Sequence, residues 1–220
     1  MNEILLNQNK MTNFQEVLNY WNNPKVESMY DKFIVYREVE LIRPLLNQGM
    51  RVLDAGCGEG ESTIEYSSVE GIRIDAVDFS DTRIYLASVR FGNKKKIKIY
   101  KKDIIVDELP FNNYDAIICQ RFLINITDWK LQQQVITKLL ESLSPKGKLI
   151  LMEGSNVGVK ELNEFRKIFG LEPIPVKWHN LFFDDKKLVD FLKNKGYRLL
   201  TNDGLGDYFM LTRGIRPNFD

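Results

Sequence analysis

The sequence predicts an α/β fold in which a mostly parallel sheet carries helices on both faces. Three observations predict it: an apolar strand that runs into a glycine-rich loop, a regular alternation of helices and strands after that loop, and acidic residues at successive strand ends. Parallel strands buried on both faces read as continuous apolar runs, because helices cover both surfaces. With 220 residues, of which 44% are hydrophobic, the chain is expected to form one domain with appendages.

The composition gives no sign of a polymeric or membrane partner. There are 31 Lys and Arg residues against 30 Asp and Glu, so no global field attracts nucleic acid or an anionic membrane. The lysine cluster at residues 94–102 has no interleaved aromatic residue except Tyr100 and is expected to be a solvated face. The chain lacks a basic, apolar leader and any apolar run of roughly 20 residues, which favours a cytoplasmic protein.

The two cysteines, Cys57 and Cys119, have the spacing of neither a metal knuckle nor a redox pair. Both are expected to be reduced thiols. No His, Asp and Glu cluster with metal-ligand spacing occurs either, so no metal is expected.

Two helical stretches are predicted ahead of the first strand. Thr12 and Gln15 form a capping box before an amphipathic helix with Phe14, Val17, Leu18 and Trp21 on its apolar side. Asn23 and Pro24 then restart the chain, and helically spaced apolar residues carry a longer helix to Gly49.

The first strand ends in a loop built for a nucleotide cofactor. Gly56, Gly58 and Gly60 permit a tight turn, and they leave no side chain between the backbone and a ligand, so the amides of the following helix can face it. The spacing is G-x-G-x-G, with Glu61 where a dinucleotide fingerprint has its third glycine. The loop therefore predicts a nucleotide cofactor and argues against a nicotinamide dinucleotide.

The next two strands end in acids. The second strand ends at Asp78, where a carboxylate can accept both hydroxyls of an adenosine ribose. The third strand, residues 97–100, leads to Asp103 and Ile104, which can accept from an adenine amine and pack on the ring. Ser80 caps the helix between these strands.

The fourth strand, residues 114–119, ends beside the first at the topological switch point, where ligands of such sheets bind. Arg121 and Asn125 follow it and are candidates to place a substrate; the alternative is that both satisfy loop carbonyls. The helix after them is capped by Thr127 or Asp128. A turn at residues 144–148 and a fifth strand, 149–152, then place Glu153 on the same edge.

The last part of the chain reads as a helix over 159–169, a long loop, a helix from Asp184 to Gly196, and two strands over 197–201 and 207–212. The loop holds His179, the chain's single histidine. Imidazole titrates near pH ~6.5, so His179 can act as a general base. The alternative is a structural histidine that holds a backbone carbonyl beside Trp178.

Five segments together resemble the class I S-adenosylmethionine-dependent methyltransferases: VLDAGCGEGE, the acid at Asp78, KKDI at 101–104, YDAIIC, and SPKGKLILMEG. The resemblance covers residues 49–153. It continues into 153–155 and 170–180, which are similar to a branch of small bacterial methyltransferases, many of them associated with surface polysaccharide clusters.

The resemblance implies a Rossmann-like fold whose seven-stranded, mostly parallel sheet ends in a C-terminal antiparallel pair. It also implies an N-terminal helical cap over 1–48 and a core over 49–220 with an acceptor-pocket insert around 154–183.

The resemblance further implies S-adenosyl-L-methionine as cofactor, with S-adenosyl-L-homocysteine as product. The residues it assigns to the cofactor are Asp54, Gly56, Gly58 and Gly60 for the methionine end, Asp78 with Phe79 for the ribose, Asp103 with Ile104 for the adenine, and in addition Gln120 and Arg37. Because N-terminal helices of the family often close over the cofactor, Tyr30, Tyr36 and Arg37 are ligand candidates. The alternatives are packing for both tyrosines and an ion pair with Glu40 for Arg37.

Methyl transfer from a sulfonium is a direct displacement, so the enzyme must align a nucleophile with the methyl carbon and exclude water. A hydroxyl acceptor benefits from a base, whereas an anionic oxygen asks for Arg or Lys. The catalytic candidates are His179, Glu153 and Arg121, with Asp128 as a substitute base. The candidates for acceptor binding are Tyr30, Arg121, Asn125, Glu153, Trp178 and His179.

The predicted function is methylation of a small molecule, with O-methylation of a sugar, nucleotide-sugar or phosphorylated precursor of a bacterial surface polysaccharide as the leading hypothesis. Enzymes that methylate nucleic-acid amines carry a signature after the fourth strand, and this chain has CQRF there instead. The sequence therefore argues against methylation of DNA or RNA bases. N-methylation of a small amine is the alternative, followed by a nicotinamide oxidoreductase and a non-catalytic cofactor-binding module. A homodimer is kept open.

Overall fold

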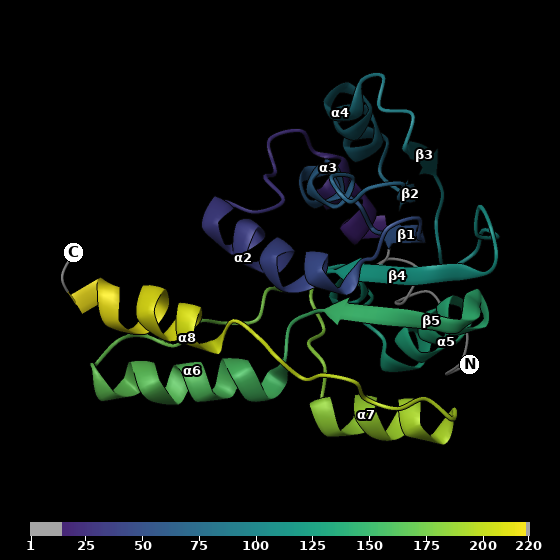
Figure 1. Cartoon of the computed structure of the whole chain (residues 1–220). Helices are drawn as coiled ribbons and strands as arrows, with labels where there is room; N and C mark the ends of the chain where they lie inside the picture. The colour runs from purple at the N-terminus through teal and green to yellow at the C-terminus, as the bar shows by residue number, and fades with distance from the viewer. Residues whose placement is uncertain (1–14, 219–220) are drawn as a thin grey trace, which may run out of the picture.

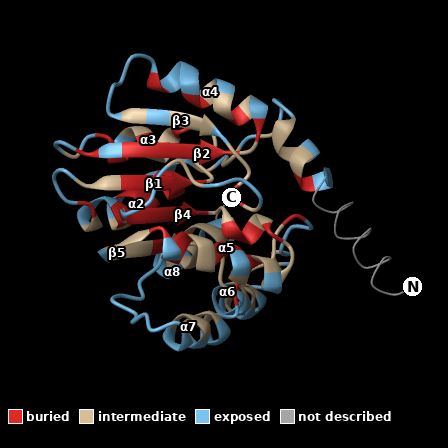
Figure 2. Cartoon of the chain, turned by 90° about the vertical axis from the view of Figure 1, so that its right-hand side faces the viewer, coloured by how far each residue is buried: buried red, intermediate tan, exposed pale blue. Residues whose placement is uncertain are grey.

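The structure is a computed structural model, and it describes residues 15–218. Five strands form one parallel sheet in the order β3-β2-β1-β4-β5. Figure 2 shows them side by side in this order, with the buried strands at the centre. Their bounds are Arg51–Ala55 for β1, Arg73–Asp78 for β2, Ile97–Lys101 for β3, Tyr114–Gln120 for β4 and Leu143–Met152 for β5. The α/β class and the Rossmann-like parallel sheet are confirmed.

Helices join the strands and cover both faces (Figure 1). Residues 15–22 are helical and are followed by α2 (Lys32–Ile42), η1 (Arg43–Leu45), α3 (Glu61–Tyr66), α4 (Asp81–Phe91), η2 (Leu123–Asn125), α5 (Trp129–Glu141), α6 (Asn156–Ile168), α7 (Asp185–Asn194), α8 (Gly206–Phe209), the π-helix η3 (Met210–Ile215) and η4 (Arg216–Asn218). Three helices begin at predicted side chains, because Ser80, Asp128 and Asp184 each accept from an amide of the first turn. The helix expected over 159–169 begins earlier, after Ser155, whose side chain accepts from the amide of Gly158.

The core has two main layers, one on each side of the sheet. In β1, Leu53 and Ala55 pack against α5, whereas Val52 faces α2 and α3. Residues of β4 alternate in the same way, with Ile117 in the first cluster and Ile118 in the second. The continuous apolar runs of the sequence thus reflect strands that are covered on both faces.

The helix predicted from Pro24 begins later than expected. Thr12 and Phe14 lie outside the described residues, but the helix at 15–22 is present. Residues 23–31 are not helical, and α2 starts after Asp31, whose side chain accepts from the amide of Ile34. The backbone carbonyls of Asn23 and Val26 accept instead from Arg83 of α4, which holds this segment in an irregular conformation.

The predicted C-terminal antiparallel pair is absent from the described chain, and the sheet has five strands rather than seven. Residues 197–201 form no strand, and residues 206–215 are helical. A Cβ at Gly214 would lie 2.6 Å from the ring of Phe165, so η3 packs tightly on α6. Tyr208 also donates to Asp31 at 2.8 Å. A short apolar run does not distinguish strand from helix by periodicity, and here helical packing prevails.

The turn predicted at residues 144–148 lies within β5. The pairing of β4 with β5 shifts between Tyr114 and Ala116, so the extra residues form an irregularity in the ladder. A Cβ at Gly147 would come within 2.6 Å of the carbonyl oxygen of Tyr114, and a side chain is therefore excluded there. In the described chain no helix has the length and apolar character to cross a bilayer.

Candidate cofactor and acceptor site

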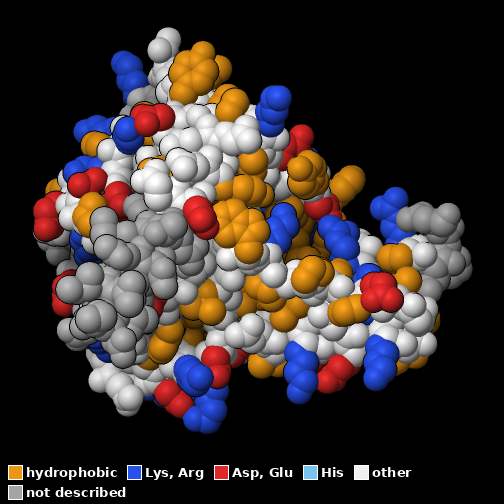
Figure 3. Space-filling model, turned by 180° about the vertical axis from the view of Figure 1, so that it is seen from behind, with side chains coloured by type: hydrophobic (Ala, Val, Ile, Leu, Met, Phe, Trp, Pro, Cys, Tyr) orange, Lys and Arg blue, Asp and Glu red, His pale blue; other side chains and the backbone are white. Residues whose placement is uncertain are grey.

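A cavity of about 1580 Å³ lies at the carboxyl ends of the strands. Figure 3 shows hydrophobic side chains gathered around a hollow on one face of the molecule. The cavity brings together most of the predicted site residues, namely Asp54, Gly56, Gly58, Asp78, Phe79, Asp103, Ile104, Gln120, Arg121, Asn125, Asp128, Glu153 and His179. Parallel strands present their carboxyl ends at one edge, which is why motifs far apart in the chain meet here.

The three glycines of the loop serve different purposes. All three have positive φ angles, between 54° and 75°. A Cβ at Gly56 would meet Phe122 at 2.6 Å and one at Gly60 would meet Phe91 at 2.3 Å, so packing demands both. At Gly58 the nearest atom to an added Cβ is the Ser28 hydroxyl at 3.8 Å. The backbone at Gly58 is therefore open on the cavity, whereas Gly60 is not among the lining residues.

Asp78 connects the glycine loop to the end of β2. Its Oδ2 accepts from the amide of Gly58 at 2.9 Å, and its Oδ1 accepts from the amide of Ser80 at 2.9 Å. Burial raises the pKa of Asp78, and the two amides oppose that shift. Each carboxylate oxygen keeps a lone pair for a further donor, such as a ribose hydroxyl.

Asp54 lies under the same loop at the end of β1. Its Oδ2 accepts from the Thr63 hydroxyl at 2.6 Å. Burial raises the pKa of Asp54 to about 6, and the charge of Asp78 adds to the shift. In the protein without ligand, the ionised form of Asp54 is therefore less stable than it would be in water.

Asp103 and Ile104 follow β3 on the cavity wall. Asp103 Oδ1 accepts from the amide of Ile105 at 2.9 Å, and burial raises the pKa of Asp103. Ile104 is buried in the core cluster while also lining the cavity. The Asp103 carboxylate and the apolar side chain of Ile104 therefore lie next to each other on the cavity wall.

The segment after β4 is held by Glu153 of the neighbouring strand. The Glu153 carboxylate accepts from the amides of Phe122 at 3.1 Å, Leu123 at 2.8 Å and Ile124 at 3.4 Å. Burial raises its pKa to about 8, although the three amides oppose the shift. Glu153 thus fixes the backbone beside the cavity.

Asn125 has both ends of its amide engaged. Its Nδ2 donates to the carbonyl of Arg121 at 2.7 Å, and its Oδ1 accepts from Trp21 Nε1 at 3.2 Å. Part of the alternative interpretation, that Asn125 satisfies a loop carbonyl, matches this geometry. Asn125 therefore links the segment after β4 to the N-terminal helix.

His179 lies in a cluster of aromatic rings and is only 3% exposed. It stacks on Tyr20 with ring centroids 4.3 Å apart and meets Trp21 and Trp178 edge-on. Burial lowers the pKa of His179, so its imidazole is neutral near pH 7. Its Nδ1 is buried without a hydrogen-bond partner among the described residues, and the backbone carbonyl expected in the alternative is not found at that atom.

Besides Gly60, four candidates do not line the cavity. Arg37 is ion-paired with Glu40 on the exposed side of α2, as its alternative interpretation describes. Tyr30, Tyr36 and Trp178 are largely exposed, and Trp178 reaches the site through its ring contacts with His179 and Tyr20. None of these four side chains contacts the cavity directly.

Sequence reasoning missed Glu38, which lines the cavity and is 4% exposed. Its Oε2 accepts from Gln120 Nε2 at 2.5 Å and lies 3.5 Å from Arg121 Nη2. A signal was present, because Glu38 falls on the apolar face of α2 that also carries Ile34, Val35, Val39 and Ile42. A charged residue in such a stripe indicates a buried polar role.

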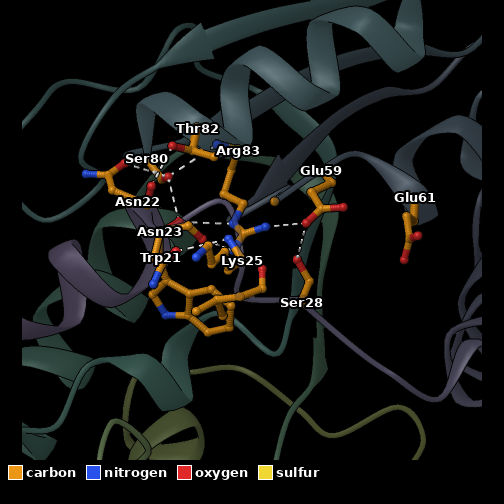
Figure 4. A network of polar contacts seen from close by, with 12 residues as sticks. Trp21, Asn22, Asn23, Lys25, Ser28, Glu59, Glu61, Ser80, Thr82 and Arg83 are labelled. Atoms are coloured by element: carbon orange, nitrogen blue, oxygen red, sulfur yellow. Dashed lines mark hydrogen bonds and ion pairs between the residues drawn. The ribbon is translucent and has the colours of Figure 1, made fainter.

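Sequence reasoning also missed Arg83, which is 2% exposed and ties three parts of the site together (Figure 4). It is ion-paired with Glu59 of the glycine loop and donates to the carbonyls of Trp21, at 3.1 Å, and Val26. Glu59 also accepts from the Ser28 hydroxyl at 3.2 Å. The Ser80 and Thr82 hydroxyls add hydrogen bonds to residues 21–22. The network fixes residues 21–28 against the glycine loop.

The chain's residues fit S-adenosylmethionine. The backbone at Gly58 is free of side chains, Asp78 keeps acceptor capacity beside it, and Asp103 with Ile104 follows on the next strand end. Within residues 15–218 no group of three or more His, Cys, Asp or Glu side chains could hold a metal ion.

Comparisons with known proteins agree with this geometry. A protein-family model described as a methyltransferase domain matches residues 52–147. The O-methyltransferase rstn1 of Aspergillus nomiae is 23% identical over 208 residues, which cover 91% of this chain and 86% of that protein.

Two solved structures share the fold. An S-adenosylmethionine-dependent methyltransferase of Leishmania major matches with a TM-score of 0.67 and 16% identity, covering 86% of this chain and 75% of that one. The magnesium protoporphyrin IX methyltransferase of Synechocystis, solved with bound S-adenosylhomocysteine, matches with a TM-score of 0.61 and 18% identity, covering 84% and 86%.

Proposed function

Since this chain is a class I S-adenosylmethionine-dependent methyltransferase, we propose that it methylates an oxygen of a small-molecule acceptor bound beside the ends of β4 and β5. The observation that carries this proposal is the position of the His179 imidazole on the cavity wall, where Tyr20, Trp21 and Trp178 pack around it. The similarity to a protein named an O-methyltransferase supports oxygen as the methylated atom.

The residues divide the work by position. We propose that Asp78, with Phe79, binds the ribose, that Asp103 and Ile104 bind the adenine, and that Gly58 lets the backbone approach the donor. Asp54 and the other two glycines shape the loop. When bound, the donor supplies a methyl group on a positively charged sulfur.

On the acceptor side, His179 takes the proton of the attacking hydroxyl. A hydroxyl carries its proton at neutral pH, so a base within reach raises its nucleophilicity. Glu153 and Asn125 act by positioning, because each holds the backbone or a side chain of the wall rather than facing the cavity with a free group. Tyr20, Trp21 and Trp178 fix the imidazole ring and exclude water from it.

A polysaccharide precursor is the finer proposal for the acceptor. It rests only on the branch resemblance of residues 170–180. N-methylation of a small amine keeps the same donor site and differs in the atom that is methylated. The domain boundary at residue 48, a cytoplasmic location, the absence of a nucleic-acid partner and a homodimer also stay predictions.

The test is turnover with a panel of acceptors. Purified protein is incubated with S-adenosylmethionine and hydroxylated acceptors, namely phenols, nucleotide-sugars and sugar phosphates, together with small amines. S-adenosylhomocysteine formation is measured, and the product is identified by mass spectrometry and NMR. We expect acceptor-dependent formation of an O-methyl product. Methylation of amines alone would contradict the proposed oxygen acceptor.

A further inference from the structure

A cluster of charged and polar side chains surrounds the carboxyl end of β4, next to the glycine loop. Glu38 comes from α2, Gln120 and Arg121 come from the end of β4, and Tyr66 comes from α3. Gln120 connects them, because its Oε1 accepts from the Tyr66 hydroxyl at 2.8 Å while its Nε2 donates to Glu38 at 2.5 Å. Glu38, Gln120 and Arg121 all line the cavity.

Arg121 in this cluster has an unused donor. Its Nη1 is buried without a hydrogen-bond partner among the described residues. Its Nη2 lies 3.5 Å from Glu38, well beyond the ~2.7–2.9 Å of a closed charge-assisted hydrogen bond. Buried donors are normally paired, so an orphaned guanidinium nitrogen on a cavity wall indicates an acceptor atom on a ligand.

The backbone of Arg121 is also held in an uncommon conformation. Its φ angle is +54°, which a residue with a side chain rarely adopts. Two hydrogen bonds maintain it: the Arg121 amide donates to the carbonyl of Met152 at 2.8 Å, and Asn125 donates to the Arg121 carbonyl at 2.7 Å. Strain of this kind persists where the surroundings fix a side chain for a purpose, ligand clamps among them.

The strand order locates this cluster relative to the donor. The proposed adenine, ribose and glycine contacts lie at the ends of β3, β2 and β1, and β4 is the next strand in the sheet. Neighbouring strands are about 4.8 Å apart, so three steps span about 14 Å, a distance comparable with an extended adenosyl amino acid. A donor laid across the sheet from β3 thus brings its amino-acid end to β4.

We propose that Glu38 and Arg121 together bind the amino-acid end of the donor. Arg121 receives the α-carboxylate at Nη1, and Glu38 accepts from the α-ammonium group. The two groups are already adjacent, and a zwitterion presents one charge of each sign to them. The inference rests on the proposed use of S-adenosylmethionine, and it gives Arg121 a donor contact rather than the acceptor contact expected from the sequence.

Two ligands that differ only at this end test the proposal. S-adenosylhomocysteine carries the amino acid, whereas 5′-methylthioadenosine keeps the adenosine and the thioether without it. Calorimetric titration without acceptor should show that Arg121→Met weakens S-adenosylhomocysteine about 10- to 100-fold and leaves methylthioadenosine unchanged. Glu38→Gln should weaken S-adenosylhomocysteine about tenfold with the same selectivity.

Matched controls separate this effect from general damage. Glu40→Gln changes an exposed acid on the same helix, and Arg43→Met removes an exposed arginine just after it. Both should bind the two ligands like the unaltered protein. Asp78→Asn should weaken both ligands alike, because both keep the ribose.

A ligand-side experiment removes any dependence on how one variant folds. An analogue of S-adenosylhomocysteine without the α-carboxylate should bind the unaltered protein weakly. Its affinity should be about that of S-adenosylhomocysteine for Arg121→Met. Arg121→Gln serves as a second variant. Neither variant should discriminate between the analogue and the natural compound.

Three results would overturn the proposal. One is equal loss of both ligands in the Arg121 variants. The second is unchanged S-adenosylhomocysteine affinity with a raised KM for an acceptor, which would place Arg121 on the acceptor. The third is equal affinity of the unaltered protein for both ligands. Failure of the unaltered protein to bind either ligand would instead contradict the proposed function itself.

Discussion

The two sides of the cavity differ in how fully their polar groups are satisfied. Along β1 and β2, Asp54 accepts from Thr63, Asp78 accepts from two amides, and buried Arg83 has an acidic partner and several carbonyls. Beyond β4, Arg121 Nη1 and His179 Nδ1 are buried without partners among the described residues. The adenosine side is thus preformed by the chain, whereas the far side is completed by ligands.

Replacing His179 should have the largest effect on turnover. This residue lies on the side of the cavity beyond β4, where polar groups lack partners among the described residues and where the acceptor is proposed to bind. If His179 is the base, His179→Ala should lower kcat by ~10²–10⁴. Calorimetry should show unchanged S-adenosylhomocysteine affinity, and thermal unfolding checks that the fold is retained. Full activity in this variant would leave His179 with a structural role.

The pH profile gives a second measure of the same residue. A base acts in its neutral form, so the rate should be constant at high pH and fall as pH drops through the pKa. Burial lowers the pKa of His179, and the fall should therefore lie below pH ~6.5. A fall centred above that value would contradict the assignment.

Removing Arg83 should produce the largest loss of stability on the satisfied side. Arg83→Met leaves Glu59 without its partner and removes donors from the carbonyls of residues 21–26. Urea unfolding should show a loss of about 3–5 kcal/mol, as for a broken buried ion pair. Arg73→Met, at the exposed start of β2, is the control and should cost almost nothing.

A double variant sharpens this prediction. Glu59→Gln combined with Arg83→Met should be more stable than Arg83→Met alone, because no uncompensated carboxylate remains. If the single variant lost less than about 1 kcal/mol, Arg83 would not hold the N-terminal segment in place.

Asp54→Asn should stabilise the protein without ligand. The pKa of Asp54 is raised from 3.8 to about 6, so the folded state disfavours the ionised carboxylate. The free-energy cost of the ionised carboxylate in the folded state is absent below pH ~4, the pKa of Asp in the unfolded chain. It grows between pH ~4 and ~6 and reaches about 3 kcal/mol above pH ~6. Urea unfolding at several pH values should show a gain near pH 8 that disappears near pH 3. A gain that did not depend on pH would contradict this origin.

Asp78→Ala should weaken S-adenosylhomocysteine by about 1–3 kcal/mol, because it removes a ribose acceptor and leaves the amides of Gly58 and Ser80 unpaired. Calorimetry measures the change directly. The matched control is Asp81→Ala, an exposed acid three residues later that pairs with Lys101. Unchanged affinity in Asp78→Ala would remove Asp78 from the donor site.

The adenosine side could be predicted from the sequence because its signals are local. Gly58 and Asp78 follow directly from the ends of apolar strands, and parallel strands bring such ends together whatever the rest of the chain does. Helix caps such as Ser80 and Asp128 act within three residues of themselves. These features need no information about distant contacts.

The far side depends on contacts between segments distant in the chain. Trp21 meets Asn125 across 104 positions, and Tyr208 meets Asp31 across 177. Neither pairing leaves a periodic signal, so residues 207–212 were expected to form a strand, whereas residues 206–215 are helical and pack on α6. Glu38 was detectable as a charge on an apolar helix face, but its pairing with Arg121 was not.

The most direct test of the account is calorimetric titration of the unaltered protein with S-adenosylhomocysteine, in parallel with NADH and without any acceptor. The preformed adenosine side predicts micromolar binding of S-adenosylhomocysteine. The G-x-G-x-G spacing of the loop predicts that NADH, although it also carries an adenosine, does not bind at these concentrations. Binding of NADH without S-adenosylhomocysteine would contradict the donor site described along β3, β2 and β1.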